Sequence, residues 1–201
     1  MAASSGVDLE AGFAAIDAAN ADDPFTIVAR GVVRPKEQAH AELAVEWVRR
    51  LDPRASEALL LAARAHHVRR WEIPRGSEDD GREGYLRWKN GLQRHHAEVA
   101  GRVLTAAGVD ATTVARVQDL VRKRRLKTDP EVRTLEDALC LVFVETQFTE
   151  LAAKLEEDHM VDVVAKSLAK MSPAGRAAAL TLSLDADAAR IVGRALEAVP
   201  T

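Results

Sequence analysis

The chain has 201 residues, of which 47% are hydrophobic and 29% are charged, a balance typical of a globular protein rather than a disordered one. Its formal net charge of −3 argues against a dedicated nucleic-acid-binding protein. The one cysteine, Cys140, excludes an intramolecular disulfide and a cysteine-rich zinc site. Neither a signal-peptide pattern nor an apolar run of membrane-spanning length is found, so we expect a cytoplasmic protein.

Apolar residues recur at helical spacing along the chain. This periodicity predicts helices over about 8–20, 35–52, 56–71, 83–107, 110–121, 135–157, 158–170 and 186–198, with a further short helix after Pro173. Ser56 and Asp110 are suited to be N-caps, and Thr134 with Asp137 resembles a capping box. The sequence therefore predicts an all-α fold, a single-domain bundle of about eight helices over residues 1–201.

Segments rich in proline, glycine or acidic residues separate the predicted helices. They lie at 22–35 and 73–81, and we interpret both as connectors. The segment 138–144 is apolar nearly all round, which predicts that its helix is the central, buried one. No run of residues alternates between apolar and polar as a half-buried strand would.

Five of the six histidines stand in three groups, each on or beside the apolar face of its own helix. They are His40, the pair His66–His67 and the pair His95–His96, while Glu145 closes the apolar segment 138–144. A charged carboxylate in such a segment is costly unless it is paired or binds a metal. Imidazole and carboxylate ligands together suit Zn, Mn, Fe or Ni, so the pattern predicts a site for one divalent transition metal.

Each of these residues, taken alone, is more often a hydrogen-bonded core residue than a ligand. Which histidine of each pair faces the interior is left open, because one residue moves a side chain by about 100° around a helix.

Residues 36–157 resemble the HD-domain superfamily of metal-dependent phosphohydrolases, with 158–201 as a helical extension. The resemblance rests on His40, on LLLAARAHH (59–67), on His96 with the two residues after it, and on TLEDALCLVFVE (134–145). His66–His67 stands where that superfamily has His-Asp, and Glu145 stands where it has Asp. The string HHVRRWEIPR (66–75) is also similar to a bacterial and fungal family defined only as a domain of unknown function.

The resemblance implies that His40, His66 and Glu145 hold the metal, with His67 as a fourth ligand. A metal-bound water would then be the nucleophile. His67, if it is not a ligand, or His95 or His96 would act as general acid or base.

Basic residues suited to an anionic substrate follow the His66–His67 pair and recur later. They are Arg69, Arg70 and Arg75, and then Arg122 and Lys123 at the start of the basic run 122–127. Arginine can bind phosphate oxygens through two hydrogen bonds, so these residues favour a small phosphorylated or otherwise anionic substrate. The run 122–127 is equally consistent with a solvated helix end.

The leading prediction is a metal-dependent hydrolase of HD type. One alternative is a non-catalytic helical interaction module with a histidine-rich core, which the His66–His67 doublet favours. Another is an iron-dependent HD-type oxygenase. A homodimer is left open.

Overall fold

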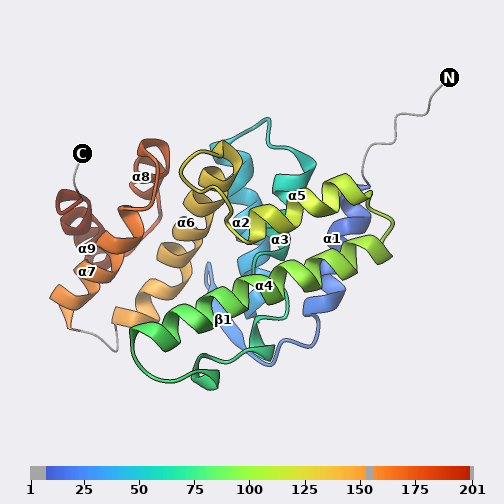
Figure 1. Cartoon of the computed structure of the whole chain (residues 1–201). Coiled ribbons are helices and arrows are strands. Elements are labelled where there is room, and N and C mark those ends of the chain that lie inside the picture. Colours follow the sequence, from blue (N-terminus) through green and yellow to red (C-terminus); the bar gives the residue numbers. More distant parts are fainter. Residues whose placement is uncertain (1–7, 153–155, 200–201) are drawn as a thin grey trace.

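The computed structural model describes residues 8–152 and 156–199, and in this part of the chain the fold is almost entirely helical (Figure 1). The all-α class predicted from the sequence is confirmed. The helices are α1 (Leu9–Asn20), α2 (Lys36–Leu51), α3 (Glu57–Ala65), α4 (Arg82–Ala106), α5 (Ala111–Val121), α6 (Pro130–Ala152), α7 (Glu157–Leu168), α8 (Pro173–Ala179) and α9 (Ala186–Glu197). Short 3-10 turns at Arg70–Glu72 and Arg75–Ser77 lie in the connector before α4.

Two of the predicted helix starts are confirmed by their capping bonds. The Ser56 hydroxyl accepts a hydrogen bond from the Leu59 amide (3.1 Å), and the Asp110 carboxylate accepts bonds from the amides of Thr112 and Thr113 (both 3.0 Å). The predicted capping box at Thr134 is wrong, because α6 begins earlier, at Pro130. The Thr134 hydroxyl lies inside this helix and donates to the Pro130 carbonyl (3.1 Å).

A short antiparallel hairpin occupies part of the predicted connector 22–35. Its strands are β1 (Thr26–Ala29) and β2 (Val32–Pro35), and they meet at the turn residues Arg30 and Gly31. Both turn residues have positive φ angles (50° and 80°), as the tight turn of a two-residue hairpin requires. Strands of four residues are too short to produce an alternation that periodicity can detect.

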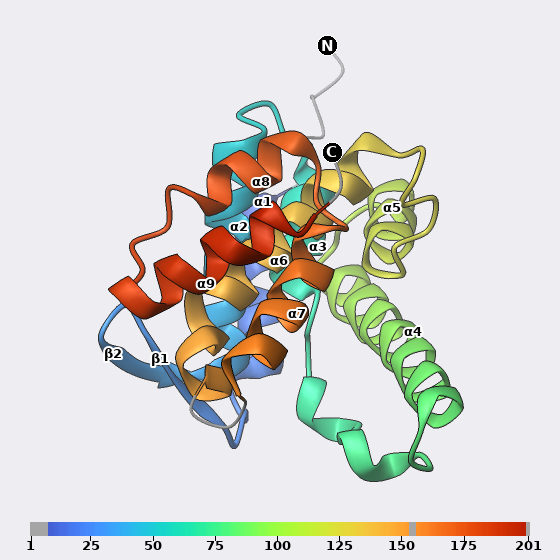
Figure 2. The same ribbon diagram turned by 90° about the vertical axis from the view of Figure 1, so that its left-hand side faces the viewer.

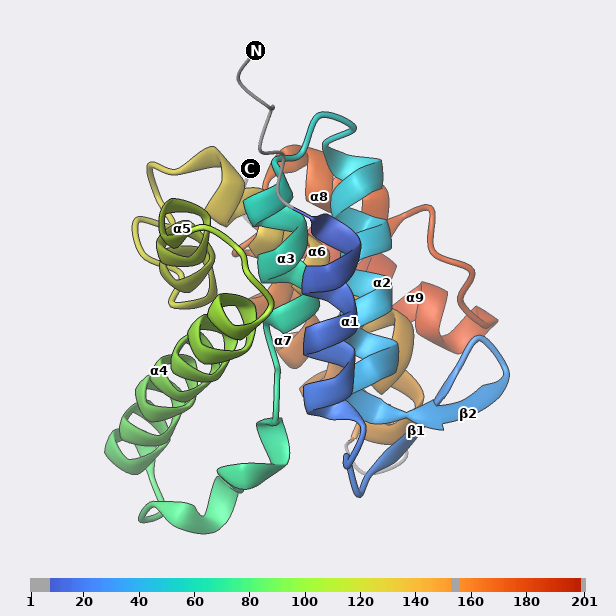
Figure 3. The same cartoon turned by 90° about the vertical axis from the view of Figure 1, so that its right-hand side faces the viewer.

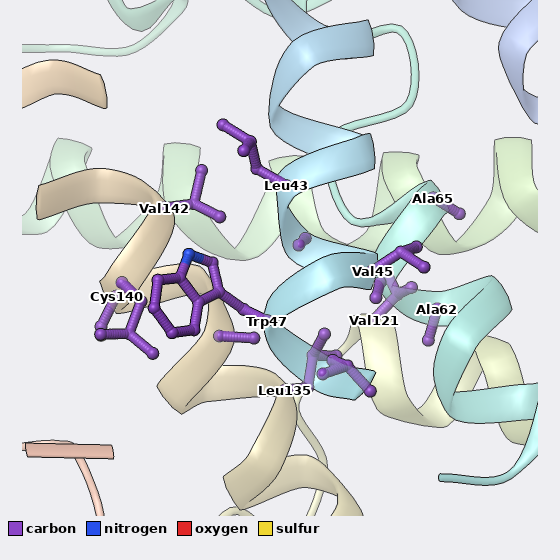
Figure 4. Close-up of a cluster of buried hydrophobic side chains, with 14 of the residues drawn as sticks. Leu43, Val45, Trp47, Ala62, Ala65, Val121, Leu135, Cys140 and Val142 are labelled. Carbon is purple, nitrogen blue, oxygen red and sulfur yellow. The ribbon is translucent and has the colours of Figure 1, made fainter. Parts of the chain in front are cut away.

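The first three helices lie side by side, and α6 packs behind them against α2 (Figure 3). Helix α4 and the connector that precedes it stand at one side of the molecule, with α7 and α9 on another (Figure 2). In the core, Trp47 of α2 reaches toward Cys140 and Val142 of α6 (Figure 4). Within the described residues, no helix combines the length and hydrophobicity of a membrane span.

Candidate functional site

A carboxylate and two imidazoles meet where the start of α2 faces the end of α3. The Glu37 Oε2 atom lies 3.4 Å from His40 Nδ1 and 3.1 Å from His67 Nδ1. Glu37 and His40 are buried, whereas His67 is partly exposed. One ligand atom from each residue lies within 4.8 Å of the other two, close enough together to hold a metal ion. We call these three residues the Glu37 cluster.

The start of α2 places Glu37 and His40 on one face. Residues three apart on a helix are neighbours, so both side chains point the same way. The Asp23 carboxylate accepts the Glu37 amide hydrogen (2.7 Å) and thereby caps the helix, whose N-cap residue Pro35 has no side-chain hydrogen bond to offer. In this first turn a carboxylate is also favoured by the helix dipole.

His67 reaches the Glu37 cluster because α3 ends just before it. The chain turns sharply at Arg69, whose φ of 52° is rare for a residue other than glycine. Asn20, buried at the end of α1, holds this turn by accepting the Arg69 amide hydrogen (2.9 Å). Helix α1 therefore supports the segment that positions His67.

The other nitrogen of His40 contacts α6. Thr146 Oγ1 lies 2.7 Å from the Val142 carbonyl and 3.2 Å from His40 Nε2. We assign the hydroxyl proton to the shorter of these bonds, so the Thr146 oxygen accepts a hydrogen bond from His40 Nε2–H. In this tautomer a neutral His40 directs the lone pair of Nδ1 at the Glu37 carboxylate, and a metal cation between these two acceptors would make the contact favourable.

The Glu37 side chain carries a negative charge. Burial opposes its ionisation, but the charge of His67 and the hydrogen bonds that His40 and His67 donate when protonated outweigh burial and hold the pKa of this carboxyl well below its ordinary value. An ionised carboxylate beside two imidazole nitrogens is a donor set for Zn, Mn, Fe or Ni.

The Glu37 cluster opens into a cavity of about 330 Å³, which we call the outer cavity. Three cationic side chains line it together with apolar ones; the complete lining is Phe25, Lys36, Glu37, His40, His67, Arg70, Trp71, Pro74 and Arg75. The Arg70 guanidinium donates to the Ile73 carbonyl (3.0 Å) and lies 4.8 Å from the Trp88 ring centre. The predicted substrate-binding residues Arg70 and Arg75 thus lie next to the candidate metal ligands.

The other histidines lie beside the cluster rather than in it. His66 and His96 are buried, and each is hydrogen bonded through Nδ1 to a backbone carbonyl, at Ala63 (2.8 Å) and Val68 (2.9 Å) respectively. Burial lowers the pKa of His66 well below its ordinary value and, together with the charge of His67, lowers the pKa of His96 to about 3. His95 Nε2 lies 3.2 Å from Glu72 Oε2.

Glu145, the carboxylate ligand predicted from the sequence, has other partners in the structure. Its Oε1 accepts from Arg30 Nε and its Oε2 accepts from Trp47 Nε1, both at 2.8 Å. The residue of α6 that faces His40 is the next one, Thr146. One residue rotates a side chain by about 100° around a helix, which turns Glu145 toward the β1–β2 hairpin instead.

The remaining predicted basic residues are not in the outer cavity. Arg69 pairs with Glu72 (2.8 Å), and Lys123 forms an ion pair with the buried Glu136. The Nε atom of Arg122 is buried without a hydrogen-bond partner.

Two residues of the site, Glu37 and Thr146, were not predicted from the sequence. The spacing Glu37-x-x-His40 was a usable signal for the first, because a carboxylate and an imidazole three residues apart share one helical face. No comparable signal marks Thr146.

Comparisons with known proteins add a family but no activity. The chain matches no functionally curated protein and no solved structure. A family described as a domain of unknown function, DUF4202, matches residues 10–192. This match covers most of the chain, and the protein therefore belongs to the DUF4202 family.

Proposed function

We propose that this protein is a metal-dependent hydrolase acting on a small phosphorylated or otherwise anionic substrate. One divalent transition metal, Mn, Fe, Ni or Zn, would be held by Glu37, His40 and His67. The observation that carries the proposal is the convergence of two imidazole Nδ1 atoms on one buried carboxylate, at the wall of a cavity that also presents cationic side chains. The resemblance of residues 36–157 to the HD-domain superfamily supports the same reaction class, with Glu37 in the role predicted for Glu145.

The ligand set suits catalysis more than a purely structural role. Three protein ligands leave coordination positions open for water and substrate, whereas structural sites are usually closed by four. A metal in such a site lowers the pKa of its bound water toward neutrality and polarises a phosphoryl oxygen. Thr146 would fix the orientation of His40 through Nε2, as outer partners of metal-bound histidines commonly do.

The cationic side chains of the outer cavity would bind the substrate. Arg70 is ordered by the Ile73 carbonyl and by the Trp88 ring, so it can offer its remaining N–H groups to phosphate oxygens with little loss of freedom. Lys36 and Arg75 would add charge that stabilises the transition state. In the reaction, water oxygen bonds to phosphorus, the ester P–O bond breaks, and the leaving alkoxide takes up a proton.

Metal binding is the first test. Purified protein would be stripped with a chelator and titrated with Mn²⁺, Fe²⁺, Ni²⁺ and Zn²⁺ by calorimetry, beside Glu37→Gln and the control Glu42→Gln. Glu42 lies on the same helix but bonds Arg34 and Gln38. We expect near-stoichiometric binding that is lost only in Glu37→Gln, and phosphate release from phosphomonoesters by the metal-loaded protein.

The same experiment separates the alternatives. Protein that binds none of the four cations, and whose melting temperature none of them changes, would favour a non-catalytic interaction module. Iron-dependent oxygen consumption without phosphate release would favour an oxygenase.

A further inference from the structure

A second cavity lies behind the outer one and shares two of its wall residues, His67 and Arg70. We call it the inner cavity. Its volume is about 250 Å³, and it lies between the turn after α3, helix α4 and helix α6. Because His67 and Arg70 belong to both linings, the two cavities lie next to each other.

Two histidines line the inner cavity as hydrogen-bond acceptors. Backbone carbonyls take the Nδ1–H groups of His66 and His96, so each neutral ring keeps a lone pair on Nε2. The Nε2 atom of His96 is buried without a hydrogen-bond partner, although an orphaned buried acceptor is destabilising. A ligand with hydroxyl or amino hydrogens would satisfy these acceptors.

The lining of the inner cavity is also cationic. Arg70, Lys89 and Lys123 contribute positive charge, and no carboxylate belongs to the lining among the described residues. The nearby Glu136 pairs with Lys123 and neutralises one charge of the three. The excess of positive charge favours an anionic group.

Lys123 occupies its place in a strained backbone conformation. Its φ is 54°, in the left-handed region that non-glycine residues rarely adopt because it is sterically unfavourable. Strain of this kind persists where the surroundings determine the conformation, and it is common at binding sites. The strained turn places Lys123 in the lining of the inner cavity, together with His67 and Arg70.

We propose that the inner cavity is a second subsite for the same substrate, and that this substrate is a polyhydroxylated compound with an anionic group at each end. One anionic group would be the phosphoryl group at the Glu37 cluster. The hydroxyl groups would donate to His66 and His96, and the second anionic group would lie between Lys89 and Lys123. The inference rests on the proposed function, which supplies the first anionic group.

The test compares sugar phosphates that differ only in the second charge. Fructose 1,6-bisphosphate, fructose 6-phosphate and inorganic phosphate would be titrated by calorimetry into the full chain, both loaded with Mn²⁺ and metal-free. We expect the bisphosphate to bind about tenfold more tightly than the monophosphate, as one additional charge-assisted contact would give.

Two lysine variants test whether that preference arises in the inner cavity, and a histidine variant tests the contact with the sugar hydroxyl groups. Lys89→Met, and Lys123→Met combined with Glu136→Gln so that no buried carboxylate is left unpaired, should each reduce the preference to about twofold or less. His96→Asn keeps an N–H group for the Val68 carbonyl but removes the Nε2 acceptor, so it should weaken binding of both sugars and leave inorganic phosphate unaffected. Lys127→Met, at an exposed lysine outside the cavity, is the matched control.

Equal affinity of wild type for the two sugar phosphates would overturn the proposal. A preference that survives both Lys89→Met and the Lys123→Met, Glu136→Gln double variant would overturn it as well. Failure here is distinguishable from failure of the proposed function. If the protein binds Mn²⁺ but does not prefer the bisphosphate, only the proposal of an inner subsite is wrong. If it binds no metal but shows a preference for the bisphosphate that depends on Lys123, only the proposal of a hydrolase is wrong.

Discussion

Two pairs of histidines lie close together in this protein, and they are held in different ways. His66 and His96 each donate a hydrogen to a backbone carbonyl, whereas His40 and His67 both direct Nδ1 at the carboxylate of Glu37. The rings of His66 and His67 are only 4.2 Å apart between centres. A neutral carbonyl leaves its histidine as an uncharged acceptor, whereas a shared carboxylate gathers two nitrogens around a negative charge. The partner of each ring therefore determines which chemistry that ring can do.

Removing the negative charge of Glu37, which His40 and His67 share, should have the largest effect on metal affinity. Glu37→Gln keeps the shape of the side chain but replaces a carboxylate ligand by a neutral amide. We expect metal affinity to fall by about 100-fold or more, since even changes outside the ligand set cost 10–100-fold. Calorimetric titration with Mn²⁺ and Zn²⁺ measures this. Unchanged affinity would show that the cluster is a structural ion pair.

Acid should lower the unfolding free energy of the protein through His96, one of the two histidines bonded to backbone carbonyls. The pKa of His96 is about 3 in the folded protein and near 6.5 in the unfolded chain, so the unfolded chain binds more protons between these values. The stability that a neutral His96 gives is complete above about pH 6.5 and is lost as the pH falls toward 3.

Urea denaturation of metal-free protein between pH 4 and 6 tests this origin of acid sensitivity. The slope of the unfolding free energy against pH should fall by about 1.4 kcal/mol per pH unit in His96→Asn, because one proton fewer is taken up on unfolding. An unchanged slope would assign the acid sensitivity to other groups.

Thr146→Val tests the assigned orientation of the His40 ring. The substitution keeps the branched shape but leaves His40 Nε2–H buried without an acceptor, which should lower the unfolding free energy by about 1–3 kcal/mol. Metal affinity should fall by about 10–100-fold. Thr134→Val is the control, because Thr134 is half-buried on the same helix and its hydroxyl donates only to a backbone carbonyl. If Thr146→Val behaves like this control in both measurements, the assigned orientation of His40 is wrong.

Glu145→Gln should have the smallest effect. Its partner Arg30 is 46% exposed, and ion pairs near the surface contribute at most about 1 kcal/mol. We expect metal affinity to stay within about twofold of wild type, since the side chain faces the hairpin. A loss as large as that in Glu37→Gln would restore the ligand set predicted from the sequence.

The helices could be predicted from the sequence because their apolar faces and N-caps are local features. The end of α3 could not, because the turn at Arg69 depends on Asn20, which is distant in the sequence. The hairpin could not be predicted either, because its short strands are stabilised by packing against α2 and α6, and α6 is distant in the sequence.

The site could be predicted in part. Histidines on apolar helix faces correctly marked the region where His40, His66, His67 and His96 gather. Glu145 was predicted as the carboxylate ligand because it ends the apolar run 138–144, whereas the carboxylate that lies beside the imidazoles, Glu37, follows an exposed connector. A rotation of about 100° per residue decides between Glu145 and Thr146, and periodicity cannot resolve it.

All three residues of the Glu37 cluster lie between positions 37 and 67, on α2 and the turn after α3. A bound metal would therefore join two consecutive helices and leave α7, α8 and α9 outside the link. Local openings of α2 or α3 would have to release the metal, so they would become rarer by a factor that grows with metal concentration. Openings of the last three helices would keep the metal bound, and their amide hydrogens would exchange as fast as before. Metal binding would thus divide the chain into a slowly exchanging N-terminal part and an unaffected C-terminal part.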